Sequence, residues 1–206
     1  MSETLLPLFP LQVVLFPGSS LPLHIFEDRY KLLIAQVVDG GKEFGINLVT
    51  EKRIAEIGCT AIVRDVVQRY DDGRMDIVVE GKRRYRLHRY DDGKAPFLLG
   101  WVEFFPTPEE TPDAALLGDT IVLYNKLVSL VFKGTVREIA LNVRRDEVSF
   151  LLAQKAGMDL TQRQLLLESD NENDRLRLLH QYLREVIPKL ERREEIERVI
   201  RSDGYL

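Results

Sequence analysis

The spacing of apolar residues changes once along this chain, near residues 105–112, and no other feature limits the fold as much. Before that point apolar residues alternate with others as in β-strands, and β-branched residues dominate at 62–67 and 77–79. After it, apolar residues recur at helical spacing. The sequence therefore predicts an α+β fold in two domains, a β-rich subdomain at 1–106 and an α-helical bundle at 107–206.

One helix is expected inside the β-rich half, and one turn stands out. Apolar residues follow helical spacing at Tyr30, Leu33, Ile34, Val37 and Val38. An Asp-Gly pair at 72–73 lies between two strand-like runs, which is a strong signal for a β-hairpin.

Helix starts in the second half are indicated by three stretches with capping-box spacing, in which a hydroxyl residue precedes a Glu or Gln by three positions. They lie at 135–138, 161–164 and 169–172. Pro188 falls within the last apolar stripe and should kink or divide that helix.

Three blocks of sequence, in one order, resemble a known family. Residues 7–30 place four prolines among large apolar side chains, which suits short edge strands joined by fixed turns. The blocks at 57–63 and 72–87 follow, and Pro96-Phe97-Leu98 continues the match. Together they are similar to the N-terminal substrate-binding domain of Lon proteases, over roughly residues 5–190.

This resemblance implies a PUA-like β core, a pseudo-barrel with one helix, and a role in recognising polypeptides. It implies unfolded or extended polypeptides as partners, with a protease or chaperone to receive them. The chain would then be a non-catalytic binding module that acts as an adaptor or delivery factor.

Catalysis is not expected from the residues themselves. Lon proteases hydrolyse ATP and cleave peptides with later domains, and this chain ends at Leu206, too soon for an ATPase domain. Gly40-Gly41-Lys42-Glu43 lacks the hydroxyl residue that a phosphate-binding loop carries after its lysine. We therefore expect no cofactor and neither ATPase nor peptidase activity.

The alternative of an unrecognised enzyme would require two or more potentially reactive side chains to share one pocket: His24, Cys59, Asp65 and His88. His24 is expected to be a hydrogen-bonded strand residue, and Cys59 a small buried side chain. The three histidines have no metal-type spacing, so no metal site is predicted.

One basic cluster, at 82–89, leaves two interpretations open. A regular strand would place Lys82, Arg84, Arg86 and His88 on one face. Arg84 and Arg86 would then be candidate contacts for RNA, which PUA-related folds can bind, or for an acidic peptide. Alternatively, the cluster is a solvated strand face beside acidic residues. The net charge of −4 argues against nucleic acid.

We expect the chain to be cytoplasmic and not bound to a membrane. The N-terminus lacks the basic and apolar regions of a signal peptide, and the single cysteine fits a reducing compartment. No apolar run approaches the ~20 residues needed to cross a bilayer.

Overall fold

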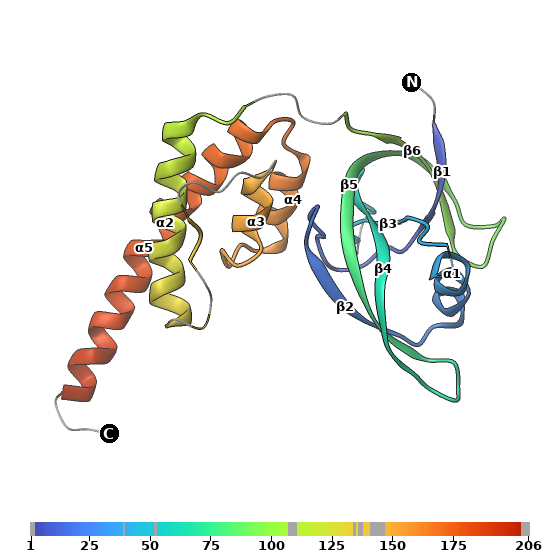
Figure 1. Ribbon diagram of the computed structural model, residues 1–206, viewed down its shortest axis with the longest axis horizontal. Helices are drawn as coiled ribbons and strands as arrows, with labels where there is room; N and C mark the ends of the chain where they lie inside the picture. Colours follow the sequence, from blue (N-terminus) through green and yellow to red (C-terminus); the bar gives the residue numbers. More distant parts are fainter. Residues whose placement is uncertain are drawn as a thin grey trace. The chain divides into compact units, whose positions relative to one another are not determined.

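The structure, a computed structural model, describes residues 3–38, 40–51, 53–106, 111–133, 135, 138–140 and 147–202. The chain forms two compact units (Figure 1). The strand unit comprises Met1–Thr107 and Asp159–Glu168, and the helical unit comprises Pro108–Met158 and Ser169–Leu206. The predicted assignment of everything after 106 to a helical domain is therefore wrong at Asp159–Glu168, which packs with the strands.

The strand unit contains six strands and two helices among its described residues. In chain order these are β1 (Thr4–Leu8), β2 (Ser20–Ile25), α1 (Asp28–Val38), β3 (Phe44–Ile46), β4 (Ile57–Arg69), β5 (Met75–Asp91), β6 (Leu98–Phe104) and α4 (Leu160–Glu168). The helical unit contains α2 (Ala114–Phe132), α3 (Val148–Ala153) and α5 (Glu172–Ser202).

The six strands form one sheet that closes on itself through the long strand β5. The strand order is β2-β5-β4-β3-β1-β6, and β6 also pairs with β5. The first part of β5 pairs with β2, from Met75 to Glu80, and its last part pairs with β6. This arrangement is the α+β pseudo-barrel that the resemblance implied. β1 and β3 pair in parallel, whereas the other pairs are antiparallel.

The predicted helix and turn both form. In α1 the buried residues are Tyr30, Leu33, Ile34 and Val37, which join the main apolar core of the strand unit. Between β4 and β5, the Gly73 N–H donates to the Tyr70 carbonyl oxygen at 2.9 Å. Gly73 has φ of +81°, a conformation that glycine adopts at little cost, so it suits this turn.

Close packing inside the barrel depends on Tyr85, whose ring is fully buried. Its hydroxyl donates a short hydrogen bond to Asn47 Oδ1. A Cβ atom added at Gly45 would lie 2.3 Å from that hydroxyl, so the site requires glycine. Burial raises the pKa of Tyr85 well above its ordinary value, which keeps the phenol protonated as a donor.

The helix caps differ from those predicted at 161–164 and 169–172. The N–H of Gln162 donates to Asp159 Oδ1 at 2.8 Å, and the N–H of Asp174 donates to Asn171 Oδ1 at 2.9 Å. Asp and Asn are among the preferred N-cap residues, and these two hydrogen bonds define the starts of α4 and α5. The stretch predicted at 135–138 lies partly outside the described residues.

Two further expectations about helices need correction. Pro188 lies inside α5, which continues through it, so the helix is not divided there and the kink stays a prediction. By length and composition, α2 could cross a membrane, contrary to the expectation that no run approached that length. One such helix is weak evidence for a span, because core helices of soluble proteins pass the same test. The buried residues of α2 include Ile121, Tyr124 and Leu127.

Candidate binding site at the start of β4

The basic cluster at 82–89 does not form the continuous face that regular alternation predicted. Arg84 is 4% exposed, and its Nη1 donates to the Leu167 carbonyl oxygen of α4 at 3.0 Å. Its guanidinium lies 4.5 Å from the centre of the Phe105 ring. The candidate contact residue Arg84 is therefore a buried packing residue of the strand unit.

The pairing of β4 with β5 is irregular near Arg84. Ala61 pairs with Gly81, but Cys59 pairs with Arg84, so three residue steps on β5 match two on β4. Buried positions are nevertheless odd-numbered on both sides of this irregularity, as at Gly81, Tyr85 and Leu87. Tyr85 is buried in an apolar core cluster, whereas Arg84 is buried through its contact with α4, and Arg86 remains exposed.

The exposed members of the cluster lie beside carboxylates. The nitrogen–oxygen distances are 2.7 Å for Lys82–Glu80, 3.0 Å for Arg83–Glu43, 3.6 Å for Arg86–Glu56, 3.2 Å for His88–Glu103 and 2.7 Å for Arg89–Glu3. Local acidic partners offset this positive charge. The arrangement matches the solvated strand face better than a phosphate-binding stripe.

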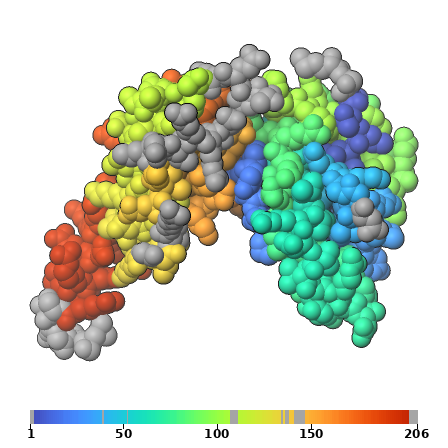
Figure 2. Space-filling view, in the orientation of Figure 1, coloured from blue at the N-terminus to red at the C-terminus, as the bar shows by residue number. Residues whose placement is uncertain are grey.

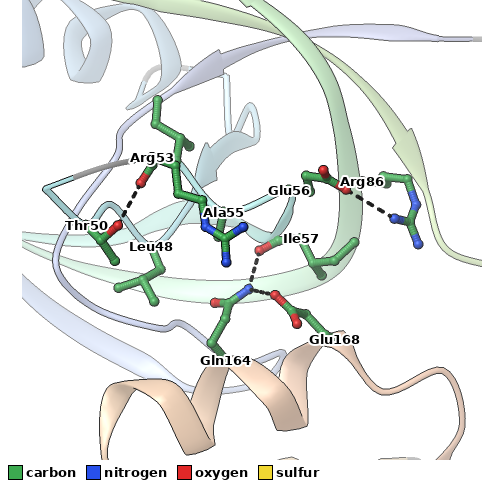
Figure 3. Close-up of a pocket in the computed structure, with 10 residues that line it drawn as sticks. Leu48, Thr50, Arg53, Ala55, Glu56, Ile57, Arg86, Gln164 and Glu168 are labelled. Atoms are coloured by element: carbon green, nitrogen blue, oxygen red, sulfur yellow. Dashed lines mark hydrogen bonds and ion pairs between the residues drawn. The ribbon is translucent and has the colours of Figure 1, made fainter.

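A pocket of about 370 Å³ opens beside Arg86, within the strand unit (Figure 3). Its walls come from Leu48, Thr50 and residues 53–57, which lead into β4, from Arg86 on β5, and from Gln164 and Glu168 on α4. Apolar wall residues are Leu48, Ile54, Ala55 and Ile57. We call this site the α4 pocket.

The position of α4 is fixed by contacts within the strand unit. Leu166 and Leu167 are buried, and Arg163 Nη2 donates to the Val14 carbonyl oxygen at 3.2 Å. The Arg163 guanidinium also lies 4.5 Å from the centre of the Phe16 ring. These contacts hold Gln164, which is 8% exposed, against the start of β4.

Hydrogen bonds orient the Gln164 amide in the α4 pocket. Its Nε2 donates to the Ile57 carbonyl oxygen at 3.0 Å and to Glu168 Oε1 at 2.8 Å, as Figure 3 shows. Both partners are acceptors here, so the nitrogen must face them. Gln164 Oε1 is buried and has no hydrogen-bond partner among the described residues.

The ionisable side chains of the α4 pocket are two arginines and two glutamates: Arg53, Arg86, Glu56 and Glu168. Equal numbers of opposite charges, apolar walls and an amide suit the binding of a small polar group. Neither a histidine nor a cysteine lines this pocket.

The four residues of the enzyme alternative line none of the three pockets described in the chain. Cys59 is fully buried, as predicted. His24 Nδ1 lies 2.6 Å from Asp76 Oδ1, in agreement with the hydrogen-bonded strand residue expected. Within the part of the chain that the structure describes, no group of three His, Cys, Asp or Glu residues could hold a metal ion.

Sequence reasoning missed the residues of the α4 pocket. Arg86 was a candidate, but Arg53, Gln164 and Glu168 were not. Their juxtaposition depends on a contact between α4 and a segment more than a hundred residues earlier. Within α4, the residues around Gln164 have the spacing expected around a surface residue, so the sequence does not single it out.

Comparisons with known proteins agree with this fold. The family model for the ATP-dependent protease La (LON) substrate-binding domain matches residues 5–185. A Lon N-terminal domain protein from Xanthomonas campestris superposes with a TM-score of 0.67 at 27% identity, covering 85% of this chain and 96% of that one. The N-terminal domain of a Mycobacterium avium complex Lon protease gives 0.68 at 21% identity, covering 87% and 98%.

Two curated relatives carry the name Lon protease. Lon protease 3 of Sorangium cellulosum is 26% identical over 85% of this chain, and the match covers 23% of that protein. Lon protease of Buchnera aphidicola is 25% identical over 84% of this chain, and the match covers 24% of that protein. The chain thus spans about a quarter of the length of these relatives.

The chain belongs to the LON substrate-binding domain family, because the family model covers most of its length. This confirms the resemblance drawn from the three sequence blocks and the α+β fold class. Membership supports a substrate-recognition module.

Proposed function

We propose that this chain is a non-catalytic polypeptide-binding module that captures unfolded or extended polypeptides in the cytoplasm and delivers them to a protease or chaperone. Family membership supports the recognition of polypeptides. We add the adaptor role because we find a recognition domain in this chain but no ATPase or peptidase motif.

The observation that carries the proposal is the edge of the sheet at β2. Among the described strands, β2 pairs only with β5, so its other side presents backbone groups that an extended peptide could pair with. Addition of a strand to such an edge is a common mode of peptide recognition, with main-chain hydrogen bonds giving affinity.

Exposed apolar side chains lie near the end of β2. Phe26, directly after the strand, is 60% exposed, and Val67 and Tyr70 are exposed where β4 ends. The His24 ring lies 6.1 Å from that of Phe26 and 6.0 Å from that of Tyr70. The tip of the β4–β5 hairpin also stands out from the strand unit in the space-filling view (Figure 2). Such a surface can hold apolar side chains of a peptide.

Titration of a fluorescently labelled, permanently unfolded protein, followed by anisotropy, tests the proposal. We expect a dissociation constant on the order of micromolar without ATP, because ordering a flexible chain opposes binding. Phe26→Ser should weaken binding several-fold. Tyr90→Ser, a matched change at another exposed aromatic residue of the strand unit, should not. A flat titration of the folded wild type would contradict the proposal.

The same titration with single-stranded RNA separates this proposal from the RNA-binding alternative. The pairing of the basic cluster with carboxylates favours little binding at about 150 mM salt. Tight RNA binding that Arg86→Gln abolishes would favour the alternative. Cell fractionation with an antibody against the chain checks the cytoplasmic location.

A further inference from the structure

In the part of the chain that the structure describes, Oε1 of Gln164 is the single buried side-chain oxygen or nitrogen without a hydrogen-bond partner. Buried polar atoms are nearly always paired, so an exception indicates either strain or a missing ligand. Gln164 lines the α4 pocket, which places this acceptor at a concave site.

Turning the amide by half a revolution would not resolve the exception. It would direct the oxygen at the Ile57 carbonyl and the Glu168 carboxylate, which both accept hydrogen bonds at present. Oxygen would then face oxygen at both contacts. The local hydrogen bonds therefore keep Oε1 available to accept from another group.

Hydrogen-bond donors lie in the same pocket as this acceptor. Arg53 forms no ion pair among the described residues, and Figure 3 shows its side chain extending toward Gln164. The Arg86 guanidinium is 3.6 Å from Glu56, a loose contact at an exposed position. The site thus combines a buried acceptor with guanidinium donors.

The charges of the pocket favour a neutral ligand. A carboxylate would meet Glu56 and Glu168 and could not donate to Gln164 Oε1. An ammonium group would meet Arg53 and Arg86 and could not accept from them. A carboxamide carries both an N–H donor and a C=O acceptor without charge, so it can satisfy Gln164 and Arg53 together.

We propose that the α4 pocket binds the carboxamide side chain of a glutamine or asparagine in a polypeptide. This inference rests on the proposed function and deepens it by naming a side chain that is recognised. The ligand amide donates to Gln164 Oε1 and accepts from Arg53. Its methylene groups contact Leu48 and Ile57. The volume, about 370 Å³, suits one side chain with adjoining backbone.

Access to Oε1 requires a small movement, because the atom is enclosed. The terminal torsion of glutamine is broad, so the amide can turn toward the pocket without leaving a preferred rotamer. Binding should therefore change the environment of the Gln164 side-chain NH₂ group as well as that of the pocket walls.

Titration with blocked amino acids by ¹H–¹⁵N NMR tests the proposal directly. N-acetyl-glutamine methylamide should shift the backbone amide signals of Ala55 and Ile57 and the side-chain NH₂ signal of Gln164. The glutamate and norleucine analogues should bind about tenfold more weakly or worse, because they leave polar groups of the pocket unpaired.

Two variants locate the binding. Gln164→Met keeps the length of the side chain and removes Oε1, and Arg53→Met removes the donor; each should abolish the preference for glutamine over norleucine. Arg53→Met changes an exposed side chain, so it serves if Gln164→Met does not fold. The matched control is Arg64→Met, at an exposed arginine of β4 outside the pocket, which should retain the preference.

The outcomes separate this inference from the proposed function. If unfolded protein binds wild type but the glutamine probe shows no preference or leaves the pocket signals unmoved, the carboxamide site is wrong and polypeptide binding stands. If the glutamine probe binds the pocket and the unfolded protein does not bind, the carboxamide chemistry stands and the delivery function is wrong. Loss of preference in Arg64→Met would also overturn the site.

Discussion

Two buried polar side chains, one in each unit, show opposite states of hydrogen bonding. In the helical unit the guanidinium of Arg175 has no exposed surface, and it is surrounded by partners. Its contacts are Glu172 at 2.9 Å, Glu147 at 3.3 Å, Ser149 Oγ at 3.1 Å and the Ser169 carbonyl oxygen at 3.2 Å. In the strand unit, Gln164 has its nitrogen paired and its oxygen unpaired.

This difference separates a structural network from a candidate binding site. The Glu172 carboxylate at the start of α5 accepts from the N–H and the hydroxyl of Ser149 in α3, both at 2.7 Å, and also holds Arg175. Arg175 thus joins α3, α5 and the segment before α5. A fully paired network offers no unpaired atom to a ligand, whereas the amide oxygen of Gln164 is an unpaired acceptor.

The largest predicted effect is on the paired network. Arg175→Met should lower the free energy of unfolding by about 3–5 kcal/mol, because the buried Glu172 carboxylate loses its counter-charge. Arg177→Met is the matched control, since Arg177 forms an exposed ion pair with Asp174 and should cost ~1 kcal/mol or less. Urea unfolding of both variants checks this. Equal losses would mean that Arg175 has no special role.

A smaller effect is expected within the strand unit, where neighbouring arginines of β5 differ in burial. Arg84→Gln should cost about 1–3 kcal/mol, because the Leu167 carbonyl oxygen loses a buried donor. Arg86→Gln should cost ~0.5 kcal/mol or less, because its side chain is 45% exposed. Thermal and urea unfolding distinguish the two changes. A solvated face carrying both arginines would instead give two small, similar values.

The smallest effect concerns the carboxyl group of Asp76, which lies at the surface. It extends the comparison of polar groups from buried side chains to exposed ones. The hydrogen bond from Tyr70, and then that from His24, lowers the pKa of Asp76. Tyr70→Phe should raise that pKa toward its ordinary value, as a ¹³C NMR titration of the carboxyl group would show. Asp72, whose pKa is lowered mainly by the Arg74 backbone N–H, provides the control and should not move.

The sign of the linked stability follows from the direction of this shift. A carboxyl group with a depressed pKa in the folded state stabilises the fold above its unfolded pKa, and this contribution is lost as the pH falls through the folded value. The loss should therefore occur below about pH 4. Because Asp76 is at the surface, the difference between wild type and Tyr70→Phe should be small. A difference that appeared only above pH 6 would contradict this account.

The features that sequence predicted are local ones. The turn at Asp72-Gly73 and the helix from Asp28 to Val38 depend on neighbouring residues, so their patterns were sufficient. The burial of Arg84 depends on its contact with Leu167, 83 residues away. The α4 pocket likewise needs a contact between Gln164 and Ile57, 107 residues apart. Patterns along the chain carry little information about contacts of that range.

The late position of α4 in the sequence also has a consequence for biosynthesis. All six strands end by Phe104, whereas α4 begins at Leu160. A ribosome that adds about 5–20 residues per second therefore completes the barrel strands roughly 3–11 seconds before it delivers α4. During that interval the nascent barrel exposes the surface that Leu166 and Leu167 later cover. A nascent chain stalled before Leu160 should for this reason attract chaperones that one stalled well beyond Glu168 does not.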